Sequence, residues 1–119
     1  MSLKILVYGS RNIEPVSLLR RILRGVPKDS IIIHGAARGV DSTAGTVARQ
    51  LGLEVEEYPA DWKRDRRGAG PIRNQLMLDQ SPDIVIAVHD DPLLGRGTRD
   101  MVDRANRKKV PTFIFLTGG

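Results

Sequence analysis

The stretch Ile31-Ile32-Ile33-His34-Gly35-Ala36-Ala37-Arg38-Gly39-Val40-Asp41-Ser42-Thr43 decides the fold predicted for this chain. Three consecutive Ile residues are typical of a strand that is covered on both faces, as in a parallel sheet. Gly35 and Gly39 allow the backbone to turn sharply and to approach a ligand closely. The helix that follows directs free N–H groups and a partial positive charge back into the turn. The stretch therefore predicts either an anion site, most often for phosphate, or a junction whose small residues serve packing alone.

The composition predicts one globular domain, residues 1–119, with an anionic partner. The chain is 40% hydrophobic and 28% charged, and its formal net charge is +5. A basic balance favours a phosphorylated small molecule or nucleic acid. No apolar run approaches the roughly 18 residues of a membrane span, so no membrane partner is expected. The absence of cysteine excludes disulfides, and the missing signal-peptide pattern predicts a cytoplasmic protein.

Strand and helix patterns alternate along the whole sequence. Strands are predicted at residues 3–8, 30–34, 53–58, 84–88 and 110–116, and apolar stripes at helical spacing lie between them. The glutamates of the third strand indicate an edge, and the unbroken apolar fourth strand indicates the centre. Residues 59–70 break the pattern and are expected to form a long connection without regular structure. The alternation predicts an α/β fold with a parallel sheet of about five strands.

Three glycine turns follow predicted strands and therefore meet at one edge of the sheet. They are Gly9-Ser10-Arg11, the turn from Gly35 to Asp41, and Gly95-Arg96-Gly97-Thr98. Ligands of open parallel sheets bind at this carboxyl edge, where the strand order reverses. Each turn carries an arginine, and the first and third also carry a hydroxyl, on Ser10 and Thr98. These groups favour a phosphate or nucleotide ligand.

Familiar nucleotide and catalytic patterns are missing. There is no G-x-G-x-x-G after the first strand and no G-x-x-x-x-G-K-[ST], which disfavours dinucleotide binding of the Rossmann type and P-loop hydrolysis. His34 and His89 each end a strand without metal-site spacing, so a structural or ligand-facing role is expected for each. Ser10 and Ser42 lack a recognisable His-Asp pair, which disfavours a serine hydrolase. Neither a cofactor nor a metal site is predicted.

Five motifs together resemble the SLOG superfamily, and within it the small cpYpsA-related, YspA-type group. The motifs are Val7-x-Gly9-Ser10-Arg11, His34 to Asp41, Pro59-Ala60-Asp61-Trp62, Gly70-Pro71-Ile72-Arg73-Asn74-x-x-Met77 and Gly95-Arg96-Gly97-Thr98-x-Asp100-Met101. The resemblance covers essentially the whole chain. It implies a single-domain, Rossmann-like three-layer sandwich with a pocket for nucleotides or nucleotide-derived ligands. Relatives often dimerise, so a homo-oligomer is also an expectation.

Two relatives suggest different activities. LOG enzymes cleave a nucleoside monophosphate, using an Arg in E-R-K-x-x-M and a Glu in P-G-G-x-G-T-x-x-E. Arg73 matches the first motif, but Met101 occupies the position of the Glu, and the neighbouring Asp100 is turned about 100° along a helix. Arg73, Asp100 and Asp41 are therefore only weak catalytic candidates. The turn from Gly35 to Asp41 resembles G-x-A-R-G-I-D of DprA, which binds single-stranded DNA.

The leading hypothesis is a nucleotide-binding or sensing module. The residues predicted to contact the ligand are Gly9, Ser10, Arg11, Gly35, Arg38, Gly39, Asp41, Asp61, Trp62, Arg73, Asn74, Gly95, Gly97 and Thr98. The alternatives are a nucleotide N-glycosidase of the LOG phosphoribohydrolase type and, less favoured because aromatic residues make up only 4% of the chain, a binder of single-stranded nucleic acid. Asp41 is predicted to accept from a ribose hydroxyl or to cap its helix. Trp62 is predicted to belong to a lid or to the core, and Met77 and Met101 to the core.

Overall fold

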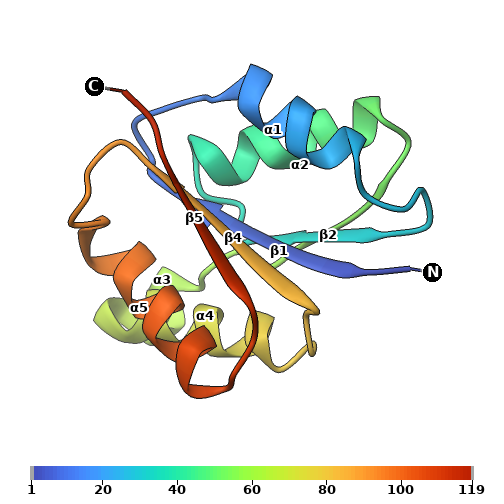
Figure 1. Cartoon of the computed structure of the whole chain (residues 1–119). Coiled ribbons are helices and arrows are strands. Elements are labelled where there is room, and N and C mark those ends of the chain that lie inside the picture. Colours follow the sequence, from blue (N-terminus) through green and yellow to red (C-terminus); the bar gives the residue numbers. More distant parts are fainter. Residues whose placement is uncertain (1, 119) are drawn as a thin grey trace.

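Five parallel strands form one sheet in the order β3-β2-β1-β4-β5, as a computed structural model of the chain shows for residues 2–118. The strands are β1 (Lys4–Gly9), β2 (Ile31–His34), β3 (Glu54–Glu57), β4 (Ile84–His89) and β5 (Thr112–Leu116). The helices are α1 (Val16–Arg24), α2 (Val40–Gln50), α3 (Trp62–Asp65), the short 3-10 turn η1 (Arg66–Gly68), α4 (Ala69–Leu78) and α5 (Gly95–Arg107). Helices α1 and α2 cover one face of the sheet, and α3, α4 and α5 cover the other (Figure 1). The predicted three-layer α/β fold is confirmed.

Alternating side chains of the central strands supply a core on each face of the sheet. Ile5 and Val7 of β1 pack with Ile32 of β2 in the cluster beneath α1 and α2. Leu6 and Tyr8, which point the other way, pack in the cluster beneath α4 and α5. Strands covered on both faces need apolar residues at every position, which explains the continuous Ile and Val runs.

Met77 and Met101 are fully buried in the cluster that lies beneath α4 and α5. Their predicted place in the core is therefore confirmed.

The chain reverses its direction of travel across the sheet at β1. From β1 it runs outward through β2 to the edge strand β3, then returns to place β4 on the other side of β1. Gly9 and Val88 are register partners at the carboxyl ends of β1 and β4, so these ends lie side by side. Such a switch point opens a crevice at the carboxyl edge of the sheet, where ligands of open α/β folds bind.

The segment 59–70 differs from its prediction, because it contains helical turns rather than an irregular connection. The Asp61 carboxylate accepts a hydrogen bond from the Arg64 amide at 3.1 Å and thereby caps α3. Helix α4 begins at Ala69, two residues before Pro71. Proline is tolerated there because the N–H groups of the first helical turn have no intrahelical acceptor.

The edge strand β5 leaves large apolar side chains exposed, namely Phe113, Ile114 and Leu116. It pairs with β4 on one side, and its other side forms an edge of the sheet. Of the helices between residues 2 and 118, none is long and apolar enough to cross a membrane.

Candidate functional site

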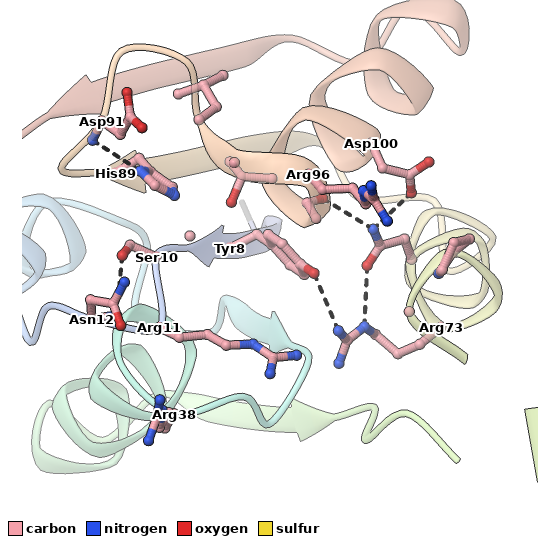
Figure 2. A pocket seen from close by; sticks show the side chains of 18 of the residues that line it. Tyr8, Ser10, Arg11, Asn12, Arg38, Arg73, His89, Asp91, Arg96 and Asp100 are labelled. Carbon is pink, nitrogen blue, oxygen red and sulfur yellow. Dashed lines mark hydrogen bonds between the residues drawn. The ribbon is translucent and has the colours of Figure 1, made fainter. Parts of the chain in front are cut away.

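A cavity of about 990 Å³ opens at the carboxyl ends of β1 and β4, between α4 and the N-terminus of α5. Figure 2 shows polar side chains from several elements turned toward it. Its lining comprises Tyr8, Gly9, Ser10, Arg11, Asn12, Arg38, Trp62, Arg67, Gly70, Pro71, Arg73, Asn74, His89, Asp91, Leu94, Gly95, Arg96, Gly97, Thr98 and Asp100. The first and third predicted glycine turns and the two residues predicted on α4 therefore meet in one cavity.

The first and second glycine turns are joined through Gly39. The Val40 amide donates to the Ser10 carbonyl at 2.9 Å, so the start of α2 lies directly against the first turn. Gly39 has φ +82°, and a Cβ there would overlap the main chain of Ser10 and Arg11. Glycine is therefore required at this position for backbone conformation and for close packing.

Asp41 holds the two turns together from inside the protein. Its carboxylate accepts from the Gly9 amide at 3.3 Å and from the Gly35 amide at 2.9 Å, and the side chain is fully buried. Burial raises the pKa of Asp41 to about 7, although these amides and the nearby Arg73 guanidinium lower it. The structure places Gly35, Gly39 and Asp41 behind the cavity wall, whereas Arg38 of the same turn lines the cavity.

The N-terminus of α5 forms a second wall. The Asp91 carboxylate accepts from the Leu93 amide at 2.9 Å, and the Leu94 amide donates to the Asp91 carbonyl at 2.9 Å. This turn delivers Leu94 and Gly95, with φ +67° and φ +65°, to the start of the helix. The first-turn amides of α5 have no acceptor within the helix and carry its positive partial charge, so this wall attracts anions.

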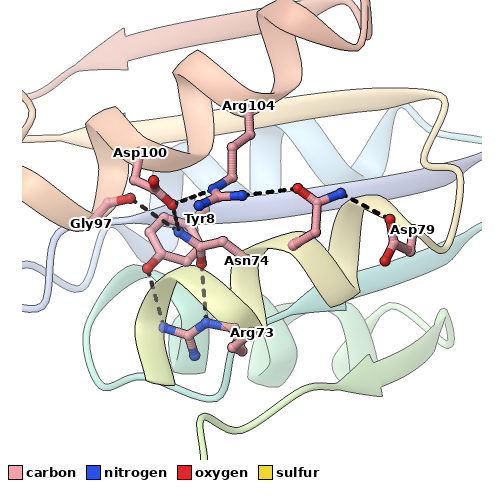
Figure 3. A network of polar contacts seen from close by, with 8 residues as sticks. Tyr8, Arg73, Asn74, Asp79, Gly97, Asp100 and Arg104 are labelled. Atoms are coloured by element: carbon pink, nitrogen blue, oxygen red, sulfur yellow. Dashed lines mark hydrogen bonds and ion pairs between the residues drawn. The ribbon is translucent and has the colours of Figure 1, made fainter. Parts of the chain in front are cut away.

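Arg73 belongs to a polar network that links α4 to β1 and to the turn after β2. Figure 3 shows its bonds to Tyr8 of β1 and to the adjacent Asn74. Its guanidinium donates to the Gly35 carbonyl, to the Tyr8 hydroxyl at 3.2 Å and to the Asn74 side-chain oxygen at 3.1 Å. The side chain is 4% exposed, and no acidic side chain of residues 2–118 forms an ion pair with it. A guanidinium has five N–H groups, so two remain beyond these three bonds.

Asn74 extends this network to α5. Its amide nitrogen donates to the Asp100 carboxylate at 2.9 Å, and Asp100 also accepts from Arg104 at 2.8 Å. Asp100 therefore reaches the cavity with its negative charge already balanced by Arg104.

Comparison with known proteins identifies the family. Residues 3–64 match the model of the YspA, cpYpsA-related SLOG family. The Gene 61 protein of Mycobacterium phage D29 is 34% identical over an alignment of 123 positions, which takes in 94% of this chain and 95% of that protein. This chain belongs to the YspA, cpYpsA-related SLOG family. The resemblance inferred from the sequence motifs is confirmed.

A solved structure shares the fold of this SLOG protein. The X-ray structure of DNA processing protein A (DprA) from Streptococcus pneumoniae superposes with a TM-score of 0.80 at 17% sequence identity. The match covers 98% of this chain and 51% of the DprA chain, so this chain spans about half of the DprA length.

Asp61 of the SLOG protein is the N-cap of α3, and Trp62 is the first residue of this helix. Trp62 lines the cavity and is 51% exposed, so it lies outside the core. Asp61 caps α3 and lies outside the cavity lining. Met101, at the position of the LOG glutamate, is fully buried. Among residues 2–118 no three His, Asp or Glu side chains cluster as a metal site would.

Several cavity residues of this SLOG protein were missing from the set predicted to contact the ligand. They are Tyr8, Asn12, Arg67, Gly70, Pro71, His89, Asp91, Leu94, Arg96 and Asp100, of which Asp100 was named only as a weak catalytic candidate. The sequence had placed His89 at a strand end, with a structural or ligand-facing role, and Arg96 in the third glycine turn, but neither was included in that set. Tyr8 is the last residue of the predicted strand 3–8, so the same strand-end signal applied to it.

Proposed function

We propose that this protein binds a nucleotide or nucleotide-derived ligand, with its phosphate at the N-terminus of α5, and acts as a binding or sensing module. The observation that carries the proposal is the buried Arg73 at the cavity wall, which forms no ion pair with any acidic side chain of residues 2–118. Asp41 lies near enough for the guanidinium to lower its pKa, but the two form no ion pair. Buried charges normally have a direct partner, and an anionic ligand would provide one.

The charge balance of the cavity favours an anion. Five arginines line it, namely Arg11, Arg38, Arg67, Arg73 and Arg96, against the two acidic residues Asp91 and Asp100. Arg104 offsets the charge of Asp100 from outside the cavity. Arg11, Arg38 and Arg96 lie on three different turns, so donors surround the cavity from several sides (Figure 2).

The size and shape of the cavity fit a nucleotide rather than a free phosphate ion. A volume of about 990 Å³ lies at the upper end of the range for small-molecule sites. The half-exposed Trp62 indole at its rim offers an apolar face on which a base can stack. In this arrangement Arg73 and the α5 amides hold phosphate, and the segment around Trp62 covers the base or ribose.

An N-glycosidase of the LOG type is less favoured. Met101 occupies the position of the LOG glutamate, and its buried side chain has no acidic group. Asp100 is the carboxylate next to Met101 on α5, but it already accepts hydrogen bonds from Asn74 and Arg104. Asp41 lies behind the cavity wall with both carboxylate oxygens accepting hydrogen bonds. A carboxylate free to stabilise a ribosyl cation is therefore not among these candidates.

Binding of single-stranded nucleic acid is the second candidate. The structural similarity to a protein named for DNA processing supports it, as do the exposed arginines around the cavity. Trp62 is the aromatic side chain best placed to stack on a base, which limits this mode to few nucleotides.

Thermal unfolding with AMP, ADP, ADP-ribose and a short oligonucleotide tests the proposal. We expect at least one nucleotide to raise Tm. Arg11→Ala should weaken binding of that nucleotide by about tenfold, because it removes one of the five arginine charges that line the cavity and attract the phosphate. Arg21→Ala, on the exposed face of α1, is the matched control and should bind like the wild type.

Three outcomes decide between the candidates. No stabilisation by any of the nucleotides at millimolar concentration contradicts the proposal. Strongly salt-dependent binding of the oligonucleotide alone, equally reduced by Arg11→Ala and Arg21→Ala, favours nucleic-acid binding on the basic surface. Release of free base from AMP at a rate that Asp100→Asn abolishes would establish the glycosidase.

A further inference from the structure

His89 is a cavity residue to which the proposed function assigns no role. It is the last residue of β4, at the carboxyl edge, and its side chain is 12% exposed. Figure 2 shows its ring beside the cavity, with the bond from Asp91 on one side of the ring. Of the two ring nitrogens, Nδ1 accepts the hydrogen bond from the Asp91 amide, and Nε2 is left for the cavity.

The contacts of Nδ1 determine which ring nitrogen carries a hydrogen. The Asp91 amide donates to Nδ1 at 3.0 Å, so in the neutral ring Nδ1 is an acceptor and the proton is on Nε2. The Asp90 carboxylate lies 3.3 Å from Nδ1 and can pair with the protonated ring. A hydrogen bond from Ser10 lowers the pKa of Asp90, which keeps this carboxylate ionised. Nε2 is an N–H donor in both states of the ring.

That donor lies beside the first residue of α5. A Cβ placed on Gly95 would be 3.3 Å from Nε2 and 3.8 Å from Cε1. The absence of a side chain at Gly95 therefore leaves the Nε2–H open toward the helix N-terminus. The unpaired amides of the first turn of α5 face the same region, and Gly97 and Thr98 of this turn also line the cavity.

We propose that the Nε2–H of His89 donates a hydrogen bond to a phosphate oxygen of the ligand, and that this contact selects phosphorylated over unphosphorylated nucleosides. The inference rests on the proposed function, because it assumes a phosphate at the N-terminus of α5. It assigns recognition of the phosphate to two adjacent sources of donors, the α5 amides and one imidazole, which are fixed in position by separate elements.

Two substitutions separate the hydrogen-bond donor from the structural role of the ring. The Gln side-chain amide in His89→Gln reaches the place of Nε2 and supplies an N–H there, whereas the shorter Asn in His89→Asn reaches only the place of Nδ1. Calorimetric titration of the wild type and both variants with AMP, adenosine and inorganic phosphate, together with Tm, gives the readout. We expect His89→Asn to bind AMP and inorganic phosphate about tenfold more weakly, which is the loss of about 1.4 kcal/mol. His89→Gln should stay near the wild type, and adenosine should not distinguish the three proteins.

The outcomes separate this inference from the proposed function. If the wild type binds AMP and both variants bind it as tightly as the wild type does, the role proposed for His89 is wrong and the proposed function stands. If both variants bind AMP and adenosine more weakly to the same extent, or if their Tm falls together with their affinity, His89 is a structural residue and the inference is overturned. If the wild type binds none of the three probes nor any other nucleotide, the proposed function fails and the inference fails with it.

Discussion

Replacing Gly39 with alanine is expected to lower the free energy of unfolding by about 4 kcal/mol. Gly39 has φ +82° and ψ −128°, a region that residues with a side chain rarely adopt. The added Cβ would also lie 2.7 Å from the Arg11 Cα and closer still to the Ser10 carbonyl. Both neighbours are backbone atoms, and Ser10 is tied to α2 and β4 by hydrogen bonds, so it and the adjoining Arg11 cannot move away at low cost.

Gly52→Ala is the matched control for this prediction. Gly52 also has a positive φ, +77°, but a Cβ there meets no atom within 4 Å. Its substitution therefore measures the conformational cost alone, about 1 kcal/mol. Urea unfolding of the two variants separates the cost of the positive φ from the cost of the steric overlap. Equal losses in both variants would show that the contact between the first and second turns is not tight.

Asp41→Asn is expected to destabilise the protein by about 2 kcal/mol in mildly acidic solution, because one of two buried amides loses its acceptor. The Asn oxygen can accept from the Gly35 amide, which leaves its NH₂ group facing the Gly9 amide. Two donors then meet in a fully buried site. Urea unfolding near pH 5 measures the difference.

The destabilisation caused by Asp41→Asn should shrink as the pH rises. The pKa of Asp41 is raised from 3.8 in the unfolded chain to about 7 in the folded protein. Between these values the folded state holds a proton that the unfolded state has released, so wild-type stability falls by up to about 1.4 kcal/mol per pH unit. The variant lacks this proton, and the difference should level off above about pH 7.

The comparison with the variant is needed because His34 acts in the opposite direction. Burial lowers the pKa of His34, so its contribution to stability rises with pH below its unfolded pKa. Both proteins contain His34, and its effect cancels in the difference. Asp103→Asn, an exposed substitution on α5, serves as the control for the removal of one carboxyl group. A difference between wild type and Asp41→Asn that is constant with pH would contradict the assigned ionisation.

The sequence predicted the layers and the edge of the sheet at which the cavity lies. Alternating strands and helices imply parallel pairing, and strand-end glycines must then meet at one edge, so Gly9, Gly97 and Thr98 could be grouped by their places in the sequence alone. The unbroken apolar run of β4 correctly indicated a central strand, and the glutamates of β3 correctly indicated an edge. These signals are periodic or positional, and they survive in a single sequence.

The directions in which side chains point could not be predicted from the sequence. Asp41 is in a glycine turn that contributes Arg38 to the cavity, yet its carboxylate points inward to the Gly9 and Gly35 amides. Local composition cannot separate these orientations, because both residues are polar and follow the same strand. The helical turns within 59–70 were also missed, since α3 depends on a single cap by Asp61 rather than on an apolar stripe. The apolar strand β5 has exposed side chains because it ends the sheet.

Nucleotide binding at the N-terminus of α5 can be tested directly by a two-dimensional amide NMR titration of the labelled protein with AMP, ADP and ADP-ribose. We expect saturable shifts of the Gly97, Thr98 and Arg11 amide signals with at least one of these ligands, and no shift at Gly52, which lies away from the cavity. Shifts that are absent at millimolar ligand, or that fall on the basic face of α1 while Gly97 and Thr98 stay unchanged, would contradict binding at this site.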